Sequence, residues 1–133
     1  MSYANFDRYF QRLGMLKMSK FQFRKILKAL PDKEIIELAR KVAQNSSKII
    51  ILARYGTLSF TSVLDYLNTL ADYAYFVERS EVLSPGQKRV ITLIHSYGEK
   101  GSIFVNAYAK ALFELINVEP KSSSTENSIT IEV

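Results

Sequence analysis

The sequence predicts an all-α fold, a single-domain bundle of five to six helices built from helical hairpins with a flexible C-terminal tail. Apolar residues recur mainly at helical spacing, and signals for helix starts and stops recur with them. A third observation is a repeat: KIIILARYGTLSF at 48–60 is similar to KRVITLIHSYGEKGSIF at 88–104. In both, an apolar run ends in Tyr-Gly, and glycine readily takes the left-handed conformation that closes a helix. We therefore expect the same helical hairpin to occur twice in the chain.

The repeat assigns a role to each of its turn residues. Gly56 and Gly98 are predicted as helix stops, and Ser59 and Ser102 as caps of the helices that follow.

The first part of the chain carries helix signals in succession. Residues 3–13 hold an aromatic stripe suited to core packing. Ser19, with Gln22 three positions later, has the spacing of a capping box, and the helix that it starts should end before Pro31. Asp32 is expected to cap the next helix, which an Asn-Ser-Ser sequence at 45–47 interrupts.

The second part is predicted to be helical as far as residue 117. A helix over 61–79 has the stripe of a bundle seam, Ser84-Pro85-Gly86-Gln87 has the signals of a helix start, and a final helix covers 102–117. After Pro120 the chain is polar, and it ends in ITIEV, a pattern that allows strand addition to a partner but is more typical of a frayed terminus. The predicted domains are a helical bundle at 1–118 and a polar tail at 119–133.

Composition restricts the class of protein. The chain has 133 residues, 47% of them hydrophobic and 23% charged, which is the balance of one globular domain. It has no cysteine, which fits a reducing compartment. No apolar run approaches the roughly 18 residues of a membrane span, and the N-terminal residues lack the plan of a secretion signal. We expect a cytoplasmic protein without membrane contact.

Charge is distributed unevenly along the chain. Residues 1–60 carry 12 basic and 4 acidic side chains, net +8, whereas residues 61–133 carry 6 and 9, net −3. This asymmetry predicts one surface that attracts a polyanion and another that meets protein neighbours, although a solvated lysine-rich surface explains the charge equally well.

Catalytic signatures are weak, so we expect no enzyme. His95 is the single histidine, without carboxylates at metal-ligand spacing, and Glu78 and Glu81 are predicted to lie at an exposed helix end. The sequence has no nucleophile elbow, phosphate-binding loop or dinucleotide fingerprint. No catalytic residue, metal ligand, cofactor or small-molecule substrate is predicted.

The predicted function is binding of RNA or DNA backbone, independent of sequence, through basic side chains. The candidate binding residues are Lys20, Arg24, Lys25, Lys28, Arg40, Lys41, Lys48 and Arg54.

A helix-turn-helix DNA-binding protein is one alternative, because IIILARYGTLSFTSVLDYL has two helices joined at a glycine. Its second helix, however, carries no lysine or arginine.

A resemblance to a known family gives a more specific interpretation. SKFQFRKIL, KIIILARYG and SIFVNAYAKALFELI resemble, in this order, the early basic, central aliphatic and closing aromatic helices of the small helical subunit of type III CRISPR effector complexes of the Csm and Cmr kind. Arg54-Tyr55-Gly56 departs from the family's Gly-Arg pairing. The resemblance implies a non-catalytic subunit that contacts guide and target RNA backbone in a multi-subunit antiviral complex, beside copies of itself and other subunits. A structural helical-bundle protein, viral or accessory, that binds no nucleic acid is a further alternative.

Overall fold

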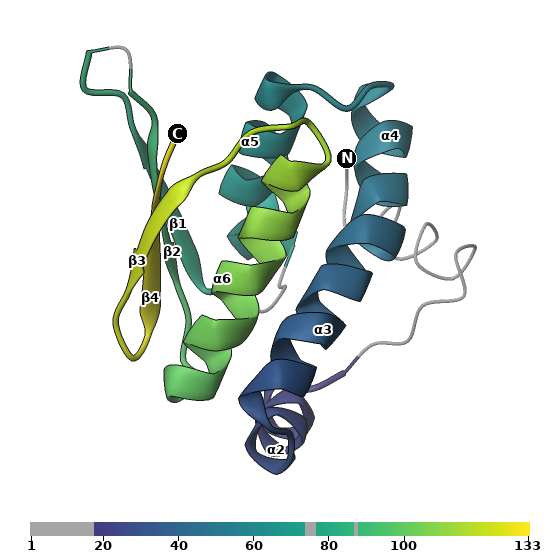
Figure 1. Ribbon diagram of the computed structural model, residues 1–133, viewed down its shortest axis with the longest axis vertical. Coiled ribbons are helices and arrows are strands. Elements are labelled where there is room, and N and C mark those ends of the chain that lie inside the picture. Colours follow the sequence, from purple (N-terminus) through teal and green to yellow (C-terminus); the bar gives the residue numbers. More distant parts are fainter. Residues whose placement is uncertain (1–17, 74–76, 87) are drawn as a thin grey trace.

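A computed structural model describes residues 18–73, 77–86 and 88–133 of the chain. Its helices lie on one side of a four-stranded antiparallel sheet (Figure 1). The all-α prediction is therefore wrong, and the fold is a mixed helix and sheet structure. The aromatic stripe predicted over 3–13 lies outside the described residues.

The N-terminal helices follow the sequence signals closely. Helix α2 (Lys20–Ala29) begins at Ser19, whose side chain accepts the amide proton of Gln22 in the predicted capping box. Helix α3 (Asp32–Val42) begins one residue earlier than expected, with Pro31 in the capping position and Asp32 in the first turn. The predicted interruption at 45–47 is not a break, because a π-helical segment (Ala43–Ser47) continues α3 into α4 (Lys48–Tyr55).

The first Tyr-Gly turn forms as predicted. Gly56 ends α4 with a φ of 76°, and its N–H donates to the carbonyl of Leu52. Ser59 then caps α5 (Phe60–Thr69), which a 3₁₀ segment (Leu70–Tyr73) continues. This part of the repeat is a helical hairpin.

The second copy of the repeat folds differently. Strand β1 (Arg79–Leu83) pairs with β2 (Val90–Ile94), and the turn between them holds Gly86 at a φ of 64°. The helix start predicted at 84–87 is therefore wrong in its described residues 84–86. The physical reason lies in 90–94, VITLI, whose β-branched residues alternate between buried and half-buried positions along a strand.

The C-terminal residues complete the sheet instead of forming a flexible tail. Strand β3 (Lys121–Ser124) and strand β4 (Ser128–Glu132) form a hairpin, and the sheet order is β1-β2-β4-β3. β4 pairs with β2 over its whole length, placing Ile131 opposite Ile91 and Ile129 opposite Leu93. All four side chains are fully buried. The predicted flexibility of the tail is wrong because its alternating isoleucines have an apolar layer to cover.

The core lies between the sheet and helix α6 (Gly98–Glu114), which itself packs between the sheet and α3 (Figure 1). Tyr108 and Phe113 of α6 are among the largest fully buried side chains. A buried hydroxyl cluster joins α6 to its neighbours: Tyr108 bonds to Ser47 of the π-helical segment and to Tyr66 of α5. One core thus unites residues from both predicted domains.

Candidate functional site

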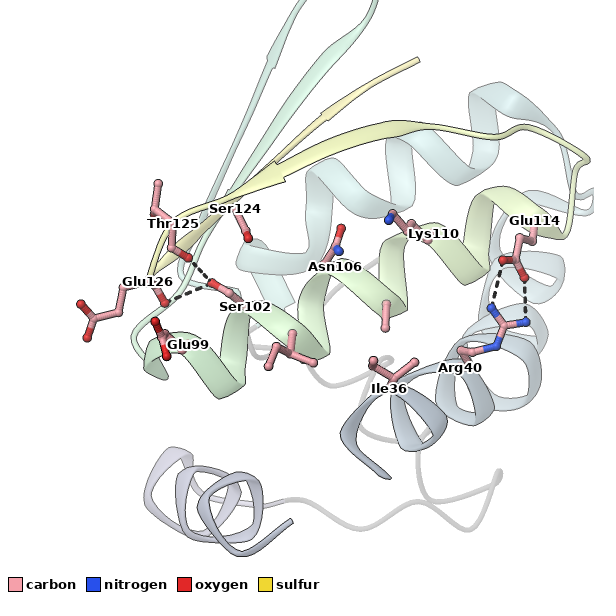
Figure 2. A pocket seen from close by; sticks show the side chains of 12 residues that line it. Ile36, Arg40, Glu99, Ser102, Asn106, Lys110, Glu114, Ser124, Thr125 and Glu126 are labelled. Carbon is pink, nitrogen blue, oxygen red and sulfur yellow. Dashed lines mark hydrogen bonds and ion pairs between the residues drawn. The ribbon is translucent and has the colours of Figure 1, made fainter. Parts of the chain in front are cut away.

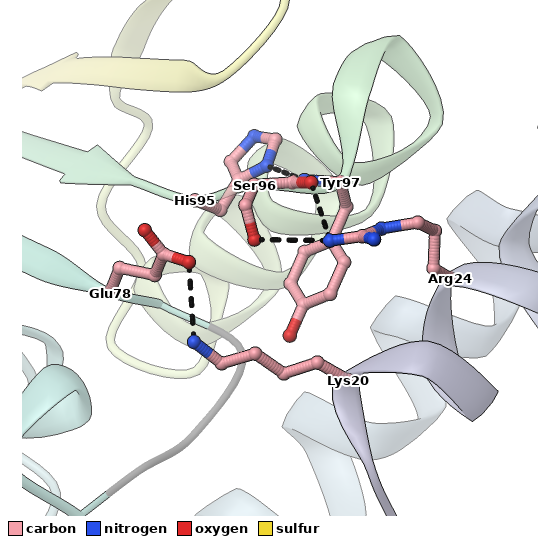
Figure 3. A network of polar contacts seen from close by, with 6 residues as sticks. All are labelled: Lys20, Arg24, Glu78, His95, Ser96 and Tyr97. Atoms are coloured by element: carbon pink, nitrogen blue, oxygen red, sulfur yellow. Dashed lines mark hydrogen bonds and ion pairs between the residues drawn. The ribbon is translucent and has the colours of Figure 1, made fainter.

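Two of the predicted binding cations hold α2 against the rest of the protein. Arg24 donates from Nη2 to the carbonyl oxygen of Ser96 at 3.1 Å, and its guanidinium lies over the ring of Tyr97 (Figure 3). One turn earlier, Lys20 pairs with Glu78 at 3.2 Å. The pKa of Glu78 lies below its usual range because the Ser96 side chain and the Lys20 ammonium both stabilise the carboxylate. These two cations therefore serve the attachment of α2.

Three further predicted cations also have partners within the protein. Arg40 contacts both carboxylate oxygens of Glu114 on α6, each at 2.9 Å. Lys41 forms an ion pair with Glu37, one helical turn earlier, and Arg54 donates a hydrogen bond to the Thr69 hydroxyl.

The remaining three predicted cations, Lys25, Lys28 and Lys48, are exposed and form no ion pair with a described carboxylate. Lys25 and Lys28 lie on the exposed side of α2, and Lys48 begins α4. α2 and α4 lie at opposite ends of α3 (Figure 1). Lys25 lies 5.4 Å from the ring centre of Phe21, which is 65% exposed. The structure thus divides the predicted site, and in the described part of the chain its exposed cations lie beside an exposed aromatic ring on α2 alone.

The helix-turn-helix candidate forms two helices joined at a glycine, but the exposed residues of its second helix do not suit DNA binding. α4, the turn at Gly56 and α5 form the predicted unit, and the exposed positions of α5 include Thr61, Asp65 and Asn68. Tyr55 donates its hydroxyl proton to Asp65, and burial together with this bond raises the pKa of Tyr55. A carboxylate on the would-be recognition helix repels the phosphates beside a DNA groove.

A hollow of about 560 Å³ lies between α3, α6 and the β3–β4 hairpin (Figure 2). We call it the α6 groove. Its lining residues are Ile36, Arg40, Glu99, Ser102, Ile103, Asn106, Ala107, Lys110, Glu114, Ser124, Thr125 and Glu126. Ile36, Ile103 and Ala107 make an apolar part, while Lys110 and Glu126 are charged and lie toward opposite ends of the groove (Figure 2).

His95 and Ser102 meet beneath this groove in a geometry that resembles a base and a nucleophile. Nε2 of His95 lies 2.8 Å from Oγ of Ser102, and both residues are buried. The N–H of Tyr97 donates to Nδ1, so in the neutral ring Nε2 carries the proton and donates to Ser102. The Ser102 hydroxyl in turn donates to the carbonyl of Thr125.

The direction of these hydrogen bonds excludes general-base activation of Ser102 in this tautomer, because the lone pair of His95 faces the Tyr97 amide. Burial also lowers the pKa of His95, which keeps the ring neutral. The pair instead fastens the β3–β4 turn to α6. Ser102 is therefore not the helix cap that its sequence position predicted, since α6 begins at Gly98.

No family model matches this chain, and no curated protein matches it. Across residues 18–73, 77–86 and 88–133, no cluster of three or more His, Cys, Asp or Glu side chains is placed to hold a metal ion. In the same residues no helix is both long and apolar enough to cross a membrane.

Proposed function

We propose that this protein binds nucleic acid without catalysing a reaction on it, and that it contacts the phosphate backbone through the solvent face of α2. The observation that carries the proposal is the surface formed by Phe21, Lys25 and Lys28. It joins two exposed ammonium groups with no carboxylate partner among the described residues to an exposed aromatic ring. Cations of this kind attract phosphates, and an aromatic face stacks on an unpaired base.

The surrounding charge supports the same proposal. Residues 18–60 carry nine basic and three acidic side chains, net +6, and the rest of the described chain is net acidic. A polyanion is therefore drawn toward the half of the protein that contains α2. Single-stranded RNA suits this surface better than a duplex does, because stacking on Phe21 needs a base that is free of its partner strand.

The assembly in which this binding takes place stays a prediction. The antiviral effector complex rests on the sequence resemblance alone, and the all-helical fold that the resemblance implied is wrong for this chain. We also propose a cytoplasmic location, which is supported by the absence of cysteine from the sequence.

A pair of charge-matched variants tests the proposal. Lys25→Gln/Lys28→Gln removes two charges from α2, and Lys88→Gln/Lys121→Gln removes two exposed charges from the sheet side of the protein. Binding of a labelled single-stranded RNA is measured at several salt concentrations. The α2 variant should bind more weakly, and its affinity should fall less steeply with salt, by about 0.7 in the logarithmic slope for each phosphate that the variant no longer neutralises. The sheet variant should bind as the unchanged protein does.

Equal weakening in both variants would show that net charge, and not α2, drives binding, and would contradict the proposed site. Stronger binding of duplex DNA of equal length would favour the helix-turn-helix alternative. If neither nucleic acid binds at low salt, the proposal is wrong and an interaction protein without nucleic acid takes its place.

A further inference from the structure

We propose that the free edge of β3, together with the α6 groove, binds an extended peptide of another protein, which adds to the sheet as a strand antiparallel to β3. The peptide carries a basic residue toward its N-terminal end, small apolar residues in the middle and a carboxylate toward its C-terminal end. This partner site is separate from the nucleic-acid surface on α2. It consists of backbone groups that bond to no other described residue, the groove beside them and the charges at the ends of that groove.

The backbone groups of Ser122 and Ser124 point away from the sheet. Arg89 and Val133 exchange both backbone hydrogen bonds, so the odd-numbered residues of β4 bond to β2. The even-numbered residues of β4 therefore bond to β3, as the bond from the Thr125 amide to the Ser128 carbonyl shows. Because bonding direction alternates along a strand, Ser122 and Ser124 present both their N–H and C=O groups to the outer edge.

The groove lies on the side of β3 where an added strand would place its side chains. Ser122 and Ser124 stand opposite Ile131 and Ile129, so their side chains share the helix-facing side of the sheet. Peptide residues opposite these serines, two positions apart, would project to the same side. There they meet Ile103 and Ala107 of α6 and Ile36 of α3, which is 42% exposed.

A buried polar atom in the groove lacks a partner. Oδ1 of Asn106 is excluded from solvent and accepts no hydrogen bond from the residues that the structure describes, although Asn106 lines the hollow and points toward β3 (Figure 2). A buried acceptor of this kind costs free energy until a donor reaches it. A backbone or side-chain N–H of a bound peptide would supply that donor once the Asn106 side chain turns into the groove.

For a strand that adds antiparallel to β3, the slightly more stable pairing, the charges at the two ends of the groove set the composition of the peptide. Glu99 and Glu126 lie at the end where α6 begins and β3 has ended, whereas Lys110 lies toward the other end, three turns along α6 (Figure 2). Lys110 forms no ion pair with a described carboxylate. A strand antiparallel to β3 enters at the acidic end and leaves near Lys110, which places a basic residue first and a carboxylate last.

The other edge of the sheet is less suited to strand addition. Helix α5 and the 3₁₀ segment contact β1, and the Ser80 hydroxyl donates to the carbonyl of Asn68. β3 is thus the edge that combines free backbone groups with a groove.

The test uses a labelled peptide, acetyl-Arg-Thr-Val-Thr-Ala-Thr-Asp-amide, whose alternate residues Arg, Val, Ala and Asp would face the groove. Its reversed-charge counterpart exchanges Arg and Asp, and a third peptide is N-methylated at Val and Ala to remove backbone donors. Binding is measured by fluorescence anisotropy on the full chain. The first peptide should bind saturably, and each of the other two at least about tenfold more weakly.

Two protein variants provide the matched comparison. Ser122→Pro removes an outward N–H that β4 does not use, so it should block strand addition while the hairpin stays intact, and should weaken binding at least about tenfold. Lys121→Gln changes a neighbouring side chain only and should bind within about twofold of the unchanged protein. Circular dichroism of both variants confirms that they are folded.

Three results would overturn the proposal: no saturable binding of the first peptide, equal binding of the N-methylated peptide, or full binding by Ser122→Pro. Self-association of the protein that is abolished in Ser122→Pro would also overturn it, because the edge would then belong to a second copy of this chain.

Discussion

The two Tyr-Gly segments of this protein share a dipeptide and nearly the same glycine conformation, yet their glycines have opposite structural roles. Gly56 and Gly98 have φ angles of 76° and 74°. Gly56 ends a helix and closes it with a bond to Leu52, within its own segment. Gly98 begins a helix after a strand, and its N–H donates to the side chain of Asn127, 29 residues away.

The structural role of a Tyr-Gly dipeptide thus depends on the segment before it and on partners distant in sequence. The run before Gly56, KIIILARY, contains the helix formers Leu52, Ala53 and Arg54. The run before Gly98 contains VITLI, which β1 and β4 hold as a strand from both sides. The second segment therefore depends on pairing with residues 128–132, whereas the turn of the first is closed by a bond within its own segment.

The largest effect should come from weakening the strand that supports the second segment. Ile131→Ala empties a fully buried position opposite Ile91 and should lower the free energy of unfolding by about 2–5 kcal/mol. Leu52→Ala, in the first segment at a position 39% exposed, should cost much less. Urea denaturation measures both. Equal losses of unfolding free energy in the two variants would show that β4 is not part of the core.

Gly101→Ala should show how tightly the second segment is packed. A Cβ at this position would lie 2.3 Å from Cβ of Tyr97 and 2.9 Å from Cε1 of His95. The backbone must shift to admit it, at a cost of about 1–3 kcal/mol in the free energy of unfolding. Thermal denaturation followed by circular dichroism checks this expectation, and an unchanged melting temperature would mean that α6 does not pack against the His95 segment in this way.

Alanine at the two turn glycines should have smaller and similar effects. No atom of the described residues lies closer than 4.0 Å to the new Cβ at either position, so each substitution should cost only the strain of a left-handed residue, about 1–2 kcal/mol in the free energy of unfolding. A pair of chemical denaturation curves compares Gly56→Ala with Gly98→Ala. A much larger effect at one glycine would show that its surroundings, and not its φ angle, decide the cost.

The smallest effect concerns pH and is confined to the second segment. Because burial lowers the pKa of His95 in the folded protein, the unfolded chain binds a proton first as the pH falls below about 6.5. The contribution of His95 to the free energy of unfolding is therefore fully present above that pH. It decreases progressively as the pH falls toward the lower pKa of the folded state. Urea midpoints at about pH 7.5 and about pH 5.5 measure this decrease.

His95→Gln is the control, since it removes the titrating group while leaving an amide that can still hydrogen-bond. The variant should lose most of the pH dependence in this window. If it keeps the full dependence, groups other than His95 are responsible.

The helical part of the fold was predictable because its signals are local. The capping box at Ser19, the stop at Gly56 and the cap at Ser59 each involve residues within a few positions of one another. The sheet was not predictable in the same way. β3 has the sequence KSSS, which contains neither β-branched nor aromatic side chains. β4 forms a strand by pairing with the apolar strand β2, which lies more than 30 residues earlier in the sequence.

The candidate sites were also only partly predictable from local sequence signals. The sequence identified the basic residues but not their partners, so it grouped Arg24 and Arg40 with Lys25 and Lys28. Arg24 bonds to Ser96 and Arg40 to Glu114, both more than 70 residues away. For the α6 groove, a signal was present: Ser102, Asn106 and Lys110 recur every four residues and put a polar stripe on an otherwise apolar helix.

Backbone hydrogen exchange over residues 119–133 reports both the pairing of β4 with β2 and the outward-facing edge of β3. The amides of Ile129 and Ile131, which bond to β2, should be among the slowest in the protein, whereas those of Ser122 and Ser124, which face solvent, should exchange fast. Uniformly fast exchange across the segment would contradict the account, since it would show a disordered tail and leave the second Tyr-Gly segment without its supporting strand.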